Sequence, residues 1–188
     1  TGDYRLTISG ADVGSPVELT VAEYEQNGVG AKFVNAADVT VTDVASALDG
    51  FVPADVDVLV TATADSDDLT GLNLSGVDSI DLAGQQSVKL EVSQAEKSTN
   101  GGYEISDSNS ALMGEFGTDS EVSSTLDAAS SVTAEDGVLT LTVAQYKALV
   151  DGDTSLSSGY VIDDTATAIA DEITTEEGIV SLGVLAGA

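Results

Sequence analysis

Apolar and polar residues alternate in three similar segments that are spread along the chain. The segments read VELTVAEY at 17–24, VKLEVSQA at 88–95 and LTLTVAQY at 139–146. The first half of each alternates with a period of two, which is typical of a half-buried strand. The second half predicts a short helix-like segment. We call this pattern the first motif, and its recurrence is the strongest signal in the sequence.

A second motif follows each copy of the first. It reads VTDVASAL at 41–48, ISDSNSAL at 105–112 and IDDTATAI at 162–169. In each copy a short strand ends at an aspartate, which is Asp43, Asp107 or Asp164, and small residues with a terminal Leu or Ile follow. Aspartate at this place predicts an N-cap, because its side chain accepts hydrogen bonds from the first free N–H groups of a helix.

The spacing between the copies is irregular, so we expect three related units with different insertions. The longest insertion follows the first unit and contains a predicted strand at 56–63, followed by Leu-containing rungs that Gly and Asp turns separate. The stretch 117–137 is polar and Ser-rich, which predicts a boundary or an exposed insertion. The predicted fold class is mainly β with short helices, in a repeat-built β-sheet or β-solenoid-like architecture. Residues 1–116 would hold repeat units 1 and 2 with a solenoid-like insertion, and 117–188 the third unit and an apolar C-terminal strand, unless both form one continuous domain.

The charge and the missing residue types narrow the function classes. The 188 residues include 33 acidic and 5 basic side chains, which gives a net charge of −28. Such a chain repels phosphate backbones and anionic membrane surfaces, and its apolar runs are too short to span a bilayer, so we expect neither nucleic acid binding nor membrane insertion. Adaptation to salt water or to secretion explains the charge without any specific ligand. The absence of Cys and His excludes disulfides, Cys-based metal sites and the commonest general base.

The two motifs also carry a resemblance. The pair LTVAQYKAL at 141–149 and GYVIDDTATAIA at 159–170 resembles segments that recur in very large, acidic, Cys-free bacterial surface proteins. The resemblance implies type I secretion, a location that is extracellular or at the cell surface, and a role as an adhesin, surface-layer component or matrix protein. It implies no catalytic residue. The glycine-rich calcium nonapeptide that is common at the ends of such proteins is absent here.

Calcium is the one cofactor that the sequence suggests, at two Asp-rich turns. Oxygen ligands clustered on a turn are what calcium requires. Asp-rich turns also arise because Asp bonds its own backbone, so both interpretations stay open. The candidate ligands are Asp65, Asp67 and Asp68 in the first turn and Asp151 and Asp153 in the second.

Enzymatic chemistry is not expected. A Ser–His–Asp triad is impossible without His, and a glycosidase site would need aromatic platforms that a chain with 4% aromatic residues and no Trp does not offer. A Ser–Lys dyad is conceivable at Lys32, Lys89, Lys97 or Lys147, but solvated surface lysines are the simpler explanation.

We therefore predict an extracellular structural protein that associates with identical subunits or neighbouring modules through its sheet edges, forming a surface layer, filament or matrix. The apolar tail 179–188 or an N-terminal strand from Tyr4 to Ile8 would pair with a neighbouring sheet. The alternative is a calcium-dependent, ligand-binding adhesin module. Because the chain begins with Thr1, either a leader has been removed or the sequence is an excerpt of a longer protein.

Overall fold

A computed structural model of the chain describes residues 17–26, 39–54, 57–85, 87–117 and 121–174. Its contacts divide these residues into two compact units. One unit contains the described residues up to Gln85 together with Lys97–Asn100, and the other contains the described residues of 87–96 and those from Gly101 onward. The division thus falls near residues 85–101, whereas the sequence suggested a boundary between 116 and 117.

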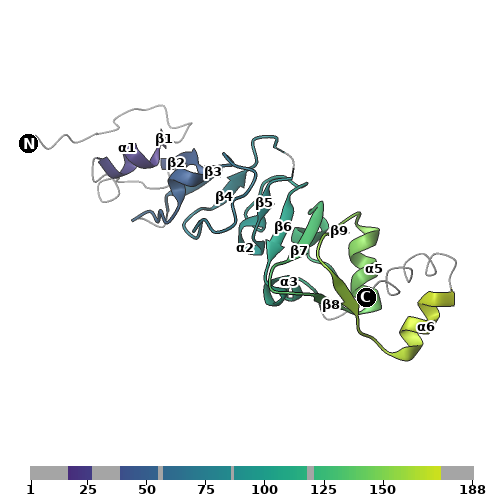
Figure 1. The fold of residues 1–188 in the computed structure, drawn as a ribbon. Coiled ribbons are helices and arrows are strands. Elements are labelled where there is room, and N and C mark those ends of the chain that lie inside the picture. Colours follow the sequence, from purple (N-terminus) through teal and green to yellow (C-terminus); the bar gives the residue numbers. More distant parts are fainter. Residues whose placement is uncertain (1–16, 27–38, 55–56, 86, 118–120, 175–188) are drawn as a thin grey trace, which may run out of the picture. The chain divides into compact units, whose positions relative to one another are not determined.

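The first unit is built on a parallel sheet whose strands follow one another in chain order (Figure 1). The strands are β1 (Val17–Leu19), β2 (Val39–Val44), β3 (Leu59–Thr63) and β4 (Ser79–Asp81). The helix α1 (Val21–Gln26) joins the first pair, and the 3₁₀ helix η3 (Ala45–Leu48) follows β2. A parallel bridge between Ile80 and Ser98 adds one more residue beyond β4.

The core of this unit is a row of apolar side chains that repeats from strand to strand. Val41 lies opposite Val60, and Ala62 lies opposite Ile80, and each of these four side chains is fully buried. The same face of neighbouring parallel strands therefore supplies the core, as the alternation of apolar and polar residues requires. Leu48, at the end of the second motif, is also fully buried.

The second unit contains two parallel sheets. The larger has the order β5-β6-β7-β9 (Figure 1), and the smaller pairs β8 with β10. Their strands are β5 (Lys89–Leu90), β6 (Glu104–Asp107), β7 (Ser131–Ala134), β8 (Leu139–Leu141), β9 (Ser155–Leu156) and β10 (Tyr160–Ile162). The helices are α2 (Val92–Ala95), α3 (Asn109–Gly114), α4 (Ser124–Asp127), α5 (Val143–Asp151) and α6 (Ala166–Thr174).

The core of the second unit repeats the arrangement of the first. Leu90 lies opposite Ile105, and Ile105 lies opposite Val132, so one buried apolar residue comes from each of three neighbouring strands. Helices cover this row with their own apolar residues. Leu112 of α3 and Leu126 of α4 are fully buried.

The predicted fold class was wrong. The described residues form parallel sheets with helix and strand in roughly equal shares, which is an α/β-like arrangement, and these strands do not close into a solenoid. The physical reason is that each motif strand is only two to six residues long and a helix follows it directly. The small, helix-compatible residues after each strand thus contribute as much structure as the strands themselves.

The Ser-rich stretch 117–137 was also misread as a boundary or an exposed insertion. Its described residues include α4 and β7, and β7 lies inside a sheet, between β6 and β9. Val132 and Ser131 in β7 are buried. In contrast, the strand–helix reading of both motifs is confirmed in all three copies. No helix within the described ranges is long and apolar enough to cross a membrane.

Candidate functional site

The most distinctive arrangement of polar side chains lies at the ends of the second-motif strands. We call Asp43, Asp107 and Asp164 the bridging aspartates, because each binds two backbone N–H groups from two different segments. One N–H belongs to the residue that follows the aspartate. The other belongs to the first residue of the helix in the preceding first motif.

The geometry of the three bridges is nearly the same. The distance from the helix nitrogen to Oδ2 is 3.1 Å for Val21 and Asp43, 3.0 Å for Val92 and Asp107, and 3.1 Å for Val143 and Asp164. The distance from the following nitrogen to Oδ1 is 2.9 Å for Val44, 2.6 Å for Ser108 and 2.6 Å for Thr165. Both oxygens of each carboxylate therefore accept a backbone hydrogen bond, which is stronger than a bond between neutral groups.

Strand register explains why the three bridges are equivalent. Leu19 pairs with Val41, Leu90 pairs with Ile105, and Leu141 pairs with Ile162. In each case the aspartate lies two residues beyond the second partner, and the first helical residue lies two residues beyond the first partner. The aspartate consequently lies opposite the start of the neighbouring helix. All three aspartates are half-buried.

The helices that receive the bridges are also capped by their own residues. A capping box joins Thr142 to Gln145 in α5, and another joins Glu91 to Gln94 in α2. At α1, Thr20 donates to Glu23 from its backbone nitrogen and its hydroxyl, both at 2.9 Å. The backbone hydrogen bond from Thr20, helped by the hydroxyl, lowers the pKa of Glu23 from its ordinary value. Each first-motif helix thus begins with several of its free N–H groups satisfied.

A second set of side chains accepts backbone N–H groups in the same way, one strand later. The backbone nitrogen of Ser46 donates to Asp65 at 3.3 Å, that of Asn109 donates to Asp136 at 2.7 Å, and that of Ala134 donates to the Ser158 hydroxyl at 3.0 Å. In each case the acceptor follows the next strand of the same sheet and stands opposite its donor in the extended register. Polar side chains therefore also connect the ends of β2 and β3, of β6 and β7, and of β7 and β9.

The bridging aspartates do not act as N-caps of the helices that follow them, as the sequence had suggested. Ser108 is the N-cap of α3 and accepts from Ala111, and the hydroxyl of Thr165 accepts from Ala168 near the start of α6. Each aspartate lies one residue too early for that role and reaches the previous helix instead. Sequence reasoning missed this partner because the contact spans 15 to 22 residues. The constant spacing within both motifs was the signal that could have revealed it.

All five aspartates of the two predicted calcium sites lie within the described residues. Asp65 accepts from the backbone and the hydroxyl of Ser46, and Asp68 accepts from the backbone and the hydroxyl of Thr70, at 3.0 and 2.6 Å. The remaining three, Asp67, Asp151 and Asp153, are exposed like the first two. Within the described part of the chain, no three acidic side chains are grouped so that they could hold a metal ion.

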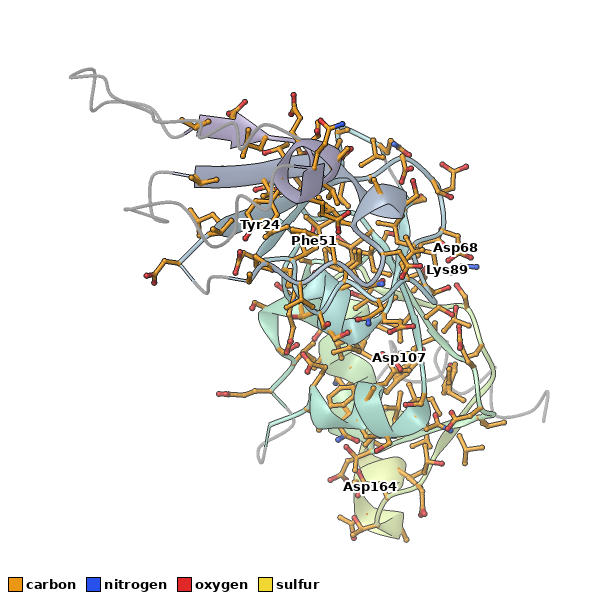
Figure 2. The ribbon with its side chains drawn as sticks, turned by 90° about the vertical axis from the view of Figure 1, so that its left-hand side faces the viewer. Tyr24, Phe51, Asp68, Lys89, Asp107 and Asp164 are labelled. Atoms are coloured by element: carbon orange, nitrogen blue, oxygen red, sulfur yellow. The ribbon has the colours of Figure 1, made fainter. Side chains whose placement is uncertain are left out.

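Three tyrosines, Tyr24, Tyr146 and Tyr160, contact other aromatic rings. Tyr24 meets Phe51 edge to face, with 5.5 Å between ring centroids, and Figure 2 shows the two side by side. Tyr146 stacks on Tyr160 at 5.1 Å. Burial, followed by the contact with Tyr146, raises the pKa of Tyr160 to about 12. Burial also raises the pKa of Tyr103, whose hydroxyl donates to the Thr125 carbonyl at 2.8 Å. These rings pack two elements together, as expected for an architectural role.

Lys97 also has a structural contact. Its Nζ donates to the carbonyl oxygens of Leu74 and Ser75, at 2.9 and 3.2 Å. Because the neighbouring Ser98 bridges to Ile80 of β4, this contact ties the loop before β4 to the sheet of the first unit.

Comparison with known proteins supplies no relative. No family model matches the chain, and neither a curated protein nor a solved structure matches it. The function is therefore inferred from the geometry described above.

Proposed function

We propose that the chain is a non-catalytic, extracellular structural module that associates through its sheet edges into a surface layer, filament or matrix. The observation that supports this proposal best is the threefold recurrence of the aspartate bridge. A catalytic site is one arrangement of side chains at one place, whereas a contact that recurs in all three pairs of motifs serves the architecture.

The state of the acidic side chains supports the same proposal. At each bridge the carboxylate already accepts two backbone hydrogen bonds, so it is committed to holding two segments together. Such a carboxylate is poorly placed to exchange protons with a substrate, because each of its oxygens already accepts a backbone N–H.

The sheet arrangement supports association. Among the described residues the three sheets are open, and the backbone N–H and C=O groups of an edge strand can pair with another chain. The net charge of −28 opposes this pairing at low ionic strength and is screened by salt.

Light scattering after size-exclusion chromatography, together with electron microscopy, tests the proposal. We expect oligomers or polymers whose mass increases with protein concentration and with sodium chloride. A chain that stays monomeric under all these conditions would refute the proposal. Calcium and chelator are included because a strict monomer that calcium stabilises strongly against heat would favour the alternative, a calcium-dependent adhesin module.

A further inference from the structure

Two tyrosines of the second unit form the one pair of phenol rings in contact among the described residues. Tyr146 lies in α5, and Tyr160 is the first residue of β10. Their ring centroids are 5.1 Å apart and their planes are inclined by only 23°, so the rings are stacked. Burial, and after it a side-chain hydrogen bond with Tyr146, raises the pKa of Tyr160 to about 12. The two hydroxyl groups therefore lie close together, and so do the ortho carbons, which are the ring carbons next to the hydroxyl groups.

The other described tyrosines have different surroundings. Tyr24 meets Phe51, whose ring has no hydroxyl group. Tyr103 is only 3% exposed, and its hydroxyl donates to the carbonyl of Thr125. Tyr146 and Tyr160, in contrast, are each half-buried, so neither ring is sealed from solvent. A small oxidant in solution can therefore reach this pair more easily than it can reach Tyr103.

We propose that Tyr146 and Tyr160 are a site of oxidative cross-linking, where a one-electron oxidant such as a peroxidase with hydrogen peroxide joins the two rings as dityrosine. Each phenol loses one electron and one proton and becomes a phenoxyl radical. The two radicals form a carbon–carbon bond between their ortho carbons, and the hydrogen on each of these carbons then moves to the phenoxyl oxygen, which restores both rings. Hydrogen peroxide takes up the two electrons and two protons and becomes two molecules of water.

The geometry favours coupling within the chain over coupling between chains. Groups that are held in contact react as if each were present at very high concentration. Two chains of net charge −28 repel each other at low ionic strength, which slows the competing reaction between them.

The cross-link would strengthen a connection that the fold already makes. It joins α5 to β10, the two elements that the contact between Asp164 and Val143 also connects. It closes a loop over residues 146–160, and this loop contains β9, a strand of the larger sheet. Closing a loop covalently restricts the unfolded chain and so stabilises the folded one, as a disulfide does. The chain has no Cys, so dityrosine is a covalent connection that it can form where a disulfide is impossible.

The experiment oxidises the full chain with peroxidase and hydrogen peroxide, at low protein and salt concentrations, in native buffer and in urea that unfolds the chain. Trypsin cuts after Lys and Arg, so it separates residues 98–147, which contain Tyr103 and Tyr146, from residues 148–188, which contain Tyr160. We expect the native chain to lose two hydrogen atoms without doubling its mass, and the two fragments to stay joined after digestion. In urea the joined fragments should be several times less abundant, because the rings no longer stack.

Single substitutions assign the cross-link to its residues. Tyr146→Phe should abolish the joined fragments, whereas Tyr24→Phe, which also removes one tyrosine, should leave their yield unchanged. Circular dichroism of both variants checks that they fold, and the comparison of native buffer with urea needs no variant. The cross-linked chain should also unfold at a higher urea concentration than the untreated chain.

Three results would overturn the inference. The first is that the Tyr146→Phe chain still gives the joined fragments, because the partner of Tyr160 is then another residue. The second is that native and unfolded chains give equal yields, and the third is that native chains cross-link mainly to one another or not at all. The inference does not depend on self-association, so none of these results decides the proposed function, which light scattering tests separately.

Discussion

Replacing one bridging aspartate should destabilise the protein much more than replacing its exposed neighbour. Asp163 and Asp164 are adjacent and carry the same charge, but only Asp164 binds the backbone nitrogens of Val143 and Thr165, at 3.1 and 2.6 Å. Asp163 is exposed. Because both Asp→Ala substitutions remove one negative charge from the same place, their difference measures the bridge without the general effect of net charge.

The expected magnitude follows from the two hydrogen bonds. A bond to a charged group contributes about 1.5–3 kcal/mol, so two bonds set an upper limit of about 3–6 kcal/mol. Asp164 is only half-buried, and water replaces part of the loss, so we expect Asp164→Ala to lower the free energy of unfolding by about 2–3 kcal/mol. Asp163→Ala should change it by less than about 0.5 kcal/mol. Asp164→Asn should recover only part of the loss, because an amide offers one acceptor oxygen and directs its N–H₂ group at the other backbone donor.

Urea unfolding followed by circular dichroism measures these differences, and hydrogen exchange locates them. The amides of Val143 and Thr165 should lose protection in Asp164→Ala, because they lose their acceptor. Equal unfolding midpoints for the Asp163 and Asp164 variants would refute the reasoning that each bridge holds a first-motif helix to the neighbouring strand.

Three further outcomes are expected. Gly76→Ala should destabilise the first unit strongly, because the added Cβ would lie 2.2 Å from the Phe51 carbonyl oxygen. Gly114→Ala should be neutral or stabilise α3 by up to about 1 kcal/mol, because no atom lies within 4 Å of the added Cβ. Urea unfolding of the two variants compares these effects. The pKa of Tyr160 is raised in the folded state, so its contribution to stability is complete below pH 10 and is lost as the pH rises through about 12. Because burial also raises the pKa of Tyr103, spectrophotometric titration should detect more than one late tyrosine. Tyr160→Phe should remove one of them, and Tyr146→Phe should shift the same one downward. Sodium chloride should raise the unfolding temperature, because it screens a net charge of −28, and an unchanged or lower value in thermal scans would contradict this expectation.

The local structure was predictable from the sequence because its causes are local. The alternation in 139–141 predicts a strand, and Thr142 with Gln145 forms the capping box that begins α5. The pairing of β8 with β10 was not predictable, because β9 lies between them in the sequence and belongs to another sheet. The contact between Asp164 and Val143 depends on that pairing, so it could not be inferred from either motif alone.

Composition is a poor guide to burial where small polar residues lie in the core. The Ser-rich stretch 117–137 is polar, but Ser131 in β7 is buried. Thr154, which is fully buried, donates to the carbonyls of Leu126 and Ala129. A hydroxyl that bonds a neighbouring backbone carbonyl can enter a core, so polarity alone does not predict exposure.

The aspartate bridges also give the architecture a direction. In every bridge the carboxylate belongs to the later strand and the N–H group to the helix that follows the earlier strand. A sheet that grows by this contact therefore has one end that offers N–H groups and another that offers carboxylates, and the two ends are different surfaces. Contacts between different surfaces are heterologous, and unless their rotation closes a ring they continue indefinitely. Self-association that continued this pattern from one copy to the next would therefore produce linear arrays in preference to closed dimers.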